Sequence, residues 1–311
     1  MTKYGKSLWI DQFPTSRVPA YPRQHGPIKT DVAIIGGGLT GCAIAYAFGV
    51  AGVNVALVEA ERIGRGSSGS AFGWIAEDPG ASFVEVEKAI GLRAARHAFQ
   101  AWRRAALDFA ALLRRLDVKC SLKPHSTSTV AITPEQVARL KREQKARSAA
   151  SLDAPSLNAR AVKSELGIDA GAAIRHKGDA VLDPYRASLG IAAAAAARGA
   201  RLFERSPVKR VTFSRKAVDV FTAGGTIRAD RVIVATGAPT ALFSSLERHF
   251  FYRASYLALT DPLPAKIRNQ LGGRDAIVRD QATPPHLVRW VNDDRLLVSG
   301  ADGEPSPLRQ R

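Results

Sequence analysis

The stretch Asp31-Val-Ala-Ile-Ile-Gly-Gly-Gly-Leu-Thr-Gly41 decides the fold, because an apolar run leads directly into closely spaced glycines. A second apolar run, Asn54-Val-Ala-Leu-Val-Glu59, follows and ends in an acid. This order predicts a strand, a glycine turn, a helix from Leu39 to Ala51 and a second strand. Together these elements form a βαβ unit of the kind that binds a dinucleotide.

Each glycine of the turn has a physical role. Gly36 permits the tight turn out of the strand, Gly38 lets the backbone approach a pyrophosphate, and Gly41 lets the helix pack closely on the sheet. The N-terminus of the helix then faces the anion, which its free N–H groups and its dipole favour. The cofactor contacts predicted from this turn are Gly36, Gly37, Gly38, Leu39, Thr40 and Gly41.

Glu59 follows Gly38 by 21 residues, the separation that places a carboxylate at the end of the second strand. There it accepts hydrogen bonds from the adenosine ribose hydroxyls and repels a 2′-phosphate, so NADP is disfavoured. Ala60, the next residue, belongs to the same predicted contact. An ordinary glycine-rich loop is the alternative, but the strand, the helix and the acid all favour a dinucleotide site.

Length and composition restrict the class of protein. A chain of 311 residues supports two domains better than one. No run approaches the roughly 20 uninterrupted apolar residues of a membrane span, and residues 1–10 lack the apolar core of a signal peptide. We therefore expect no membrane span and a cytoplasmic location. Cys42 and Cys120 support neither a disulfide framework nor a metal site, and we predict that Cys42 is a small buried thiol.

The net charge of +17 raises the question of nucleic acid. Basic residues gather over 93–115 and 139–147 at helix-surface spacing, without the interleaved aromatics on which bases stack. A solvated helix face is the preferred interpretation, so we expect no specific nucleic-acid site. The charge still favours an anionic substrate.

Beyond Glu59, helix and strand patterns alternate. Arg62–Ile75 is a loop dense in glycine and serine, whose backbone donors suit a phosphate or a planar ring, although a flexible connection is the alternative. Apolar spacing over Phe83–Leu116 predicts two helices with their aromatic residues in the core. The pattern then predicts a strand over Ser126–Thr133, a helix from Pro134 to about Ala149 and a loop over Ser151–Asn158.

The second half supplies another helix-to-strand step. Leu182-Asp-Pro184 opens an alanine-rich helix to Arg198, and Gly199–Glu204 follows as a strand. Ile227–Ala238 is an apolar strand that closes on Ala-Thr-Gly. Such a strand end lies at the ligand-bearing edge of an open α/β sheet.

From about Ser7 to Asp302, the order of these motifs resembles the DAO-type family of FAD-dependent oxidoreductases. This family includes D-amino acid oxidase, glycine oxidase and sarcosine oxidase, and the gamma-glutamylputrescine oxidase branch is among the most similar. In the family, the turn matching Gly66–Gly73 runs beside the isoalloxazine, the Pro207-Val208 step meets adenine, and Ala235-Thr-Gly237 lies beside the diphosphate. The resemblance therefore adds as predicted cofactor contacts Gly66, Ser67, Ser68, Gly73, Trp74, Val208, Ala235, Thr236 and Gly237.

The resemblance also implies a reaction. A hydride passes from a carbon bearing an amine to flavin N5, and the resulting imine hydrolyses in water. The substrate is then a small-molecule amine or amino acid, and the electrons go to oxygen or another acceptor. No His or Cys lies within Gly66–Gly73, where some relatives attach flavin covalently, so FAD is expected to bind non-covalently. No general base is obligatory, and the catalytic residues and the oligomeric state stay unknown.

Arg289 is the substrate-binding candidate. It lies on a strand predicted over 285–291, near where relatives place an arginine in a Tyr-x-x-Arg-like segment, and a guanidinium fork suits a carboxylate. His286 stands where an aromatic residue is common, so an arginine on a surface strand is an equal alternative. Further pocket candidates, for which a core position is the preferred interpretation, are Trp74, Tyr252 and Tyr256.

We predict an α/β chain (α+β overall), with an FAD/NAD(P)-binding Rossmann-like three-layer domain and an inserted mixed antiparallel-sheet substrate domain. The FAD-binding domain comprises residues 1–80 and 180–240, and the substrate-side domain comprises residues 81–179 and 241–311. Family members continue beyond the strand at 295–301, so we expect that the C-terminal part is missing and that FAD binding is weakened. The alternatives are a non-catalytic remnant of the family and, less favoured, an NAD-dependent dehydrogenase.

Overall fold

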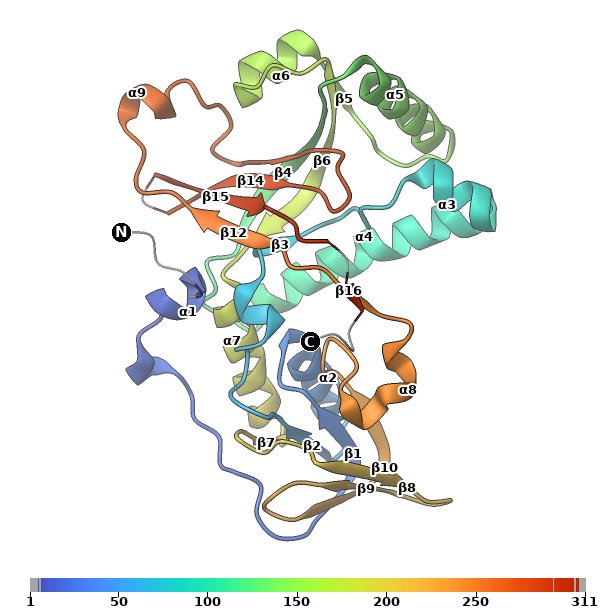
Figure 1. The fold of residues 1–311 in the computed structure, drawn as a ribbon, viewed down its shortest axis with the longest axis vertical. Helices are drawn as coiled ribbons and strands as arrows, with labels where there is room; N and C mark the ends of the chain where they lie inside the picture. The colour runs from blue at the N-terminus through green and yellow to red at the C-terminus, as the bar shows by residue number, and fades with distance from the viewer. Residues whose placement is uncertain (1–4, 6, 293, 305, 308–311) are drawn as a thin grey trace.

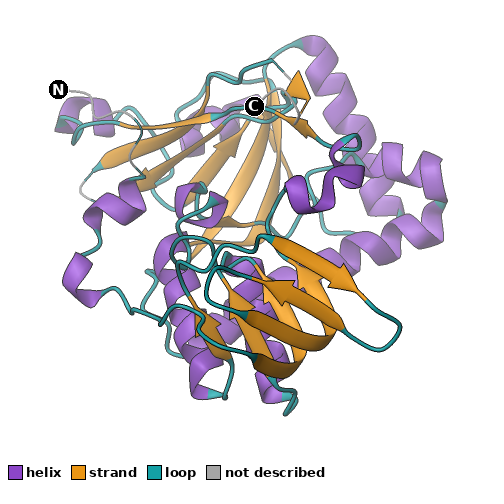
Figure 2. Cartoon of the chain, turned by 60° about the horizontal axis from the view of Figure 1, so that its bottom comes forward, coloured by secondary structure: helices purple, strands orange, loops and turns teal. Residues whose placement is uncertain are grey.

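The strands form two main sheets, one in each half of the molecule (Figure 1). The structure, a computed structural model, describes residues 5, 7–292, 294–304 and 306–307. A six-stranded sheet lies at the bottom of Figure 1, and a larger sheet lies above it. Figure 2 shows them as separate groups of strands with loops between.

The six-stranded sheet has the order β7-β2-β1-β10-β9-β8. Its parallel strands are β1 (Ile28–Ile35), β2 (Val55–Val58), β7 (Arg201–Phe203) and β10 (Thr226–Val234). The sheet continues in antiparallel fashion through β9 (Val218–Phe221) and β8 (Arg210–Phe213). Helices α2 (Leu39–Val50) and α7 (Pro184–Ala197) pack against each other on one face. The βαβ unit predicted over Asp31–Glu59 is thus confirmed.

Both faces of this sheet bury apolar side chains, which explains why β1 and β2 are apolar runs. Val32 and Ile34 lie in the cluster that contains α2 and α7, whereas Ala33 and Ile35 lie in a cluster on the opposite face. Cys42 of α2 is fully buried, and burial raises its pKa to about 12. The prediction of a small buried thiol is therefore confirmed.

The larger sheet has the order β12-β15-β14-β13-β4-β6-β3, and β5 also pairs with β6. It is mixed, because β13 runs parallel to β4 whereas its other pairs are antiparallel. The strands are β3 (Trp74–Ile75), β4 (Lys123–Ala131), β5 (Ser156–Asn158), β6 (Ala172–Val181), β12 (Tyr256–Leu259), β13 (Ala276–Arg279), β14 (Leu287–Val291) and β15 (Arg295–Gly300). The exact division into two domains stays a prediction.

Helices accompany this sheet along the middle of the sequence: α3 (Phe83–Ile90), α4 (Leu92–Arg115), α5 (Pro134–Ala149) and α6 (Ala159–Leu166). The two helices predicted over Phe83–Leu116 are confirmed. The helix from Pro134 to Ala149 is also confirmed, and a capping box of Thr133 and Gln136 begins it. The loop predicted over Ser151–Asn158 is wrong in its last part, because three residues there form β5 through backbone pairing with β6.

The remaining elements are short: α1 (Leu8–Gln12), η1 (Thr15–Arg17), η2 (Ser67–Ser70), η3 (Ala241–Phe243), α8 (Ser244–Glu247), β11 (Phe251–Tyr252), α9 (Ala265–Arg268) and β16 (Ser306–Pro307). In the described part of the chain, no helix combines the length and apolarity needed to cross a membrane. Within the same part, no group of His, Cys, Asp and Glu side chains is placed to hold a metal ion.

Two aromatic residues do not lie in the core as predicted. Trp102 of α4 and Tyr256 of β12 are both exposed. The ring N–H of Trp102 donates to the carbonyl oxygen of Ala76 at 3.0 Å, so a hydrogen bond holds the ring at the surface. The side chain of Tyr252 lies outside what the structure describes.

A buried ion cluster joins α3 and α5 to the segment that follows β3. Arg147 of α5 donates to Asp78 and, at 2.7 Å, to Glu143. The Glu143 carboxylate also accepts from the backbone N–H of Phe83 at the start of α3, at 2.6 Å. A second cation, Arg279 of β13, lies 3.8 Å from Asp78. Two cations and two acids thus compensate one another where water is largely excluded.

Asp78→Ala tests how far the fold depends on this cluster. The change leaves Arg147 and Arg279 without their shared acid, so we expect the free energy of unfolding to fall by about 3–5 kcal/mol. Asp108→Ala removes the partner of Arg104 in an exposed pair and should cost less than about 1 kcal/mol. Urea denaturation measures both losses, and losses of equal size would contradict the role given to Asp78.

The same acid gives stability a pH dependence. Burial alone would raise the pKa of Asp78, but attraction to Arg147 and His176 holds it below its ordinary value. Because the folded pKa is the lower one, the stabilisation is complete above the unfolded pKa of about 4 and is lost as the pH falls through the folded value. In urea denaturation, the difference in the free energy of unfolding between the unaltered protein and Asp78→Ala should therefore become smaller in acid. A free-energy difference that does not change with pH would contradict the lowered pKa of Asp78.

Candidate functional site

The glycine turn makes a close backbone contact between β1 and β10. Gly36 has a φ of +110°, and a Cβ there would lie 2.5 Å from the carbonyl oxygen of Ala235. A Cβ at Gly41 would overlap the carbonyl oxygen of Gly36, so α2 packs this closely only with glycine. The end of β10 and the start of α2 therefore converge at the carboxyl edge of the parallel strands.

The start of α2 is open toward that edge. Gly38 is the N-cap of α2, and a Cβ there would have only Ser68 Oγ nearby, 3.2 Å away. Ser68 Oγ accepts a hydrogen bond from the backbone N–H of Leu39 at 2.9 Å, which places the glycine-serine loop beside the helix N-terminus. An opening at the N-terminus of a helix suits a pyrophosphate.

Backbone donors hold the Glu59 carboxylate at the end of β2. Oε2 accepts from the N–H of Gly37 at 2.6 Å, and Oε1 accepts from the N–H of Glu61 at 2.9 Å. Buried Glu204 fixes the turn that follows, because its Oε1 accepts from the N–H of Ile63 at 2.8 Å. Sequence reasoning missed Glu204, although an acid that closes a predicted strand was an available signal.

The glycine-serine loop crosses from the six-stranded sheet to the larger one. Its η2 turn packs against α7. Gly73 has a φ of +76°, and its carbonyl oxygen accepts from the N–H of Leu182 at 3.0 Å. The ring N–H of half-buried Trp74 donates to Asp179 at 2.8 Å. Specific hydrogen bonds therefore tie the loop to both halves of the molecule.

The structure brings most predicted cofactor contacts to one edge. Those linked by the contacts above are Gly36, Gly37, Gly38, Leu39, Gly41, Glu59, Ser68 and Ala235. Their direct neighbours in sequence are Thr40, Ala60, Ser67, Thr236 and Gly237. Val208 packs in the cluster on the sheet face opposite α2, and a Cβ at Gly66 would meet open space. Trp74 and Arg289 instead belong to the larger sheet. Their roles as contacts stay predictions.

Arg289 of β14 is buried close to two aromatic rings. Its guanidinium carbon lies 5.5 Å from the ring centre of Trp9 and 5.3 Å from that of Phe72. Nη2 donates to the carbonyl oxygen of Phe72 at 3.0 Å, whereas the buried Nε has no partner among the described residues. Burial lowers the pKa of Arg289 to about 10, and attraction to Asp183 opposes this shift. Arg289 is therefore not an arginine on a surface strand.

Comparison with known proteins identifies the family behind this arrangement. Residues 31–311 match the DAO family, described as FAD dependent oxidoreductase. The chain belongs to this family. Gamma-glutamylputrescine oxidoreductase of Escherichia coli (strain K12) is 28% identical over 308 residues, which cover 96% of this chain and 70% of that protein. FAD is thus the cofactor class, as predicted, and the NAD-dependent alternative is disfavoured.

Solved structures confirm the fold. Glycine oxidase from Geobacillus kaustophilus superposes with a TM-score of 0.69 at 22% identity, over 90% of this chain and 73% of that one. L-proline dehydrogenase from P. horikoshii superposes with a TM-score of 0.70 at 20% identity, over 90% of this chain and 72% of that one. The predicted fold class of this DAO-family chain is therefore confirmed.

The residues at the carboxyl edge of the six-stranded sheet fit FAD. The N-terminus of α2 offers N–H groups beside Gly38, where the absence of a Cβ leaves room for a pyrophosphate. Glu59 is fixed by two backbone donors and keeps further lone pairs for ribose hydroxyls. The positions predicted for the pyrophosphate and the ribose thus lie on consecutive elements of one βαβ unit, α2 and β2.

Two glycine variants separate cofactor contact from packing. In Gly38→Ala the methyl group approaches only Ser68 Oγ, so the apoprotein should keep its melting temperature. FAD affinity should fall by about tenfold or more, because the methyl group enters the pyrophosphate position. In Gly41→Ala the methyl group overlaps the Gly36 carbonyl, so stability and affinity should both fall. FAD titration and thermal unfolding measure the two effects, and unchanged FAD affinity in Gly38→Ala would remove the cofactor assignment of this turn.

Proposed function

We propose that this FAD-dependent oxidoreductase oxidises the C–N bond of an amine or amino acid. The carbon bearing the amine loses a hydride, the nitrogen lone pair completes the imine, and water hydrolyses the imine to a carbonyl compound. Bound FAD supplies the two-electron acceptor, at its N5 atom. The names of similar proteins support this substrate class, because they include gamma-glutamylputrescine oxidoreductase, glycine oxidase and L-proline dehydrogenase.

The buried guanidinium of Arg289 supports a substrate that has a carboxylate. No ion pair among the described residues includes Arg289, and its Nε is unpaired. A buried cation without a paired acid is unfavourable. A substrate carboxylate would relieve that cost, because it accepts two parallel N–H···O bonds from a guanidinium.

The position of Arg289 also fits this role. A Cβ at Gly73 would lie 3.1 Å from Arg289 Nη2, so the guanidinium borders the turn that resembles the family's isoalloxazine contact. The rings of Trp9 and Phe72 flank the cation and exclude water from it. In this proposal Arg289 binds and orients the substrate and transfers no proton.

The visible spectrum of the purified chain is the first test of the function. We expect flavin bands after FAD titration, because the N-terminus of α2 is open beside Gly38 and two backbone donors hold the Glu59 carboxylate. Anaerobic addition of amines and amino acids should then bleach the flavin for at least one substrate. A folded protein that retains no flavin, or a bound flavin that no amine or amino acid bleaches, would contradict the proposal.

Arg289→Lys tests the carboxylate contact. A lysine keeps the charge but loses the planar fork, so we expect the KM for an amino acid to rise by about tenfold or more. The KM for the matching amine without a carboxylate should change little. Arg279→Lys is the control, because Arg279 is a largely buried arginine on the adjacent strand β13 and already lies near Asp78. Equal shifts for both substrates, or in both variants, would make Arg289 structural.

A further inference from the structure

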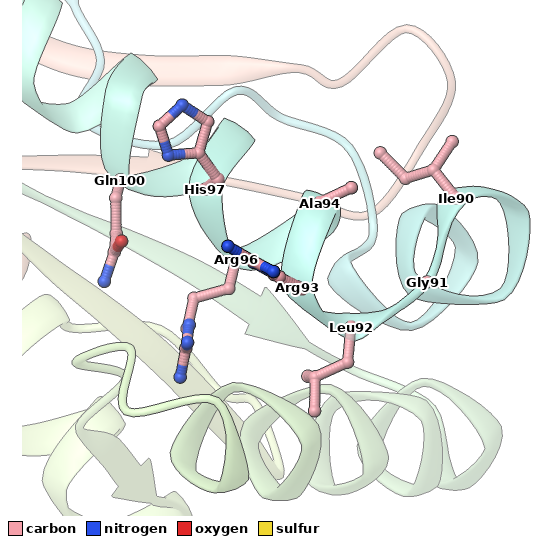
Figure 3. A pocket seen from close by; sticks show the side chains of 8 residues that line it. All are labelled: Ile90, Gly91, Leu92, Arg93, Ala94, Arg96, His97 and Gln100. Carbon is pink, nitrogen blue, oxygen red and sulfur yellow. The ribbon is translucent and has the colours of Figure 1, made fainter.

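A hollow lies away from the cofactor edge, where α3 meets α4. In Figure 1 this corner projects at the right-hand side of the molecule. Its volume is about 740 Å³, and Figure 3 shows the residues that line it: Ile90, Gly91, Leu92, Arg93, Ala94, Arg96, His97 and Gln100. The hollow contains no predicted cofactor or substrate residue, so the proposed reaction does not account for it.

Apolar side chains gather at this corner without being covered. Ile90 is 55% exposed and Leu92 is 47% exposed. Gly91 connects the two helices with a φ of +82°, so the chain reverses sharply and presents Ile90 and Leu92 at the turn. Exposed apolar side chains that cluster in this way mark an interaction surface more often than scattered ones do.

Three cations lie close in sequence to these apolar side chains. Lys88, Arg93 and Arg96 are exposed, and no ion pair among the described residues uses them. The nearby acids are Glu85 and Glu87 of α3, so the corner keeps a positive charge within a chain of net charge +17. Figure 3 shows Leu92, Arg96 and Gln100 extending from the same side of α4. The apolar side chain of Leu92 and the cation of Arg96 therefore face the same side of α4, where one partner would contact both.

We propose that the α3–α4 corner docks on a membrane surface that contains anionic phospholipid. Ile90 and Leu92 enter the boundary between headgroups and acyl chains, while Arg93 and Arg96 bind headgroup phosphates at the hollow. The contact is peripheral and needs no spanning helix. Charge complementarity favours a lipid over a nucleic acid as the partner, because a nucleic acid would use the cations and leave the exposed apolar side chains without a role.

Vesicle flotation of the full chain tests this docking. We expect binding to vesicles of phosphatidylcholine mixed with phosphatidylglycerol and much weaker binding to phosphatidylcholine alone. The double variants Ile90→Asp with Leu92→Asp, and Arg93→Glu with Arg96→Glu, should each lower the bound fraction by about tenfold. Both changes lie on exposed side chains, so circular dichroism should show an unaltered fold.

The control variants make the same types of substitution at exposed residues away from the α3–α4 corner. Arg114→Glu with Arg115→Glu changes two exposed arginines at the other end of α4, and Ile267→Asp changes an exposed isoleucine on α9. Both controls should bind as the unaltered protein does. Equal losses in controls and corner variants would show attraction by net charge alone and would overturn the proposal. Binding to RNA or DNA that survives the aspartate variants, without vesicle binding, would overturn it as well.

Discussion

The contact between Gly36 and the end of β10 fixes the positions of the residues at the carboxyl edge of the six-stranded sheet. Without a Cβ, the turn after β1 lies against the carbonyl of Ala235, and the N-terminus of α2 then starts at the sheet edge instead of above it. Gly41, in the first turn of α2, allows an equally close approach to the Gly36 carbonyl oxygen. Because β2 is in register with β1, the Glu59 carboxylate reaches the Gly37 N–H. The geometry of the predicted pyrophosphate and ribose contacts therefore depends on the absence of a Cβ in this turn.

The second half of the molecule depends on a different principle, the compensation of buried charge. The segment from Phe72 to Gly80 contains β3, an edge strand of the larger sheet. Each end of the segment meets an arginine, because Arg289 donates to the Phe72 carbonyl and Arg279 donates to the Gly80 carbonyl. Between these points Asp179 accepts from the ring of Trp74. The segment that follows the glycine-serine loop is therefore held by polar contacts. These contacts tolerate little displacement, since the loss of one partner would leave a buried donor or acceptor without a hydrogen bond.

The difference between these principles explains what the sequence revealed. The glycine turn, α2 and Glu59 are close in sequence and obey a period and a spacing, so the pattern alone predicted their arrangement. Asp78 and Arg147 are 69 residues apart, and neither has a local pattern that marks a partner. Glu204 does close a predicted strand, but the Ile63 N–H that it accepts from lies 141 residues away, so the sequence did not reveal that contact. The surroundings of Arg289 come from three separated segments, so its strand was predictable but its burial was not.

Three arginines of this chain therefore differ in how their charge is compensated. Arg147 is buried with two acids, so its charge is already compensated and it serves the fold. Arg93 is exposed, and water solvates it at little cost until a partner arrives. Arg289 is buried with one carbonyl and two rings, and the attraction of Asp183 does not outweigh the effect of burial on its charge. The fold keeps this unfavourable cation beside the loop that resembles the flavin contact, and an anionic ligand is the chemistry that makes such a position favourable.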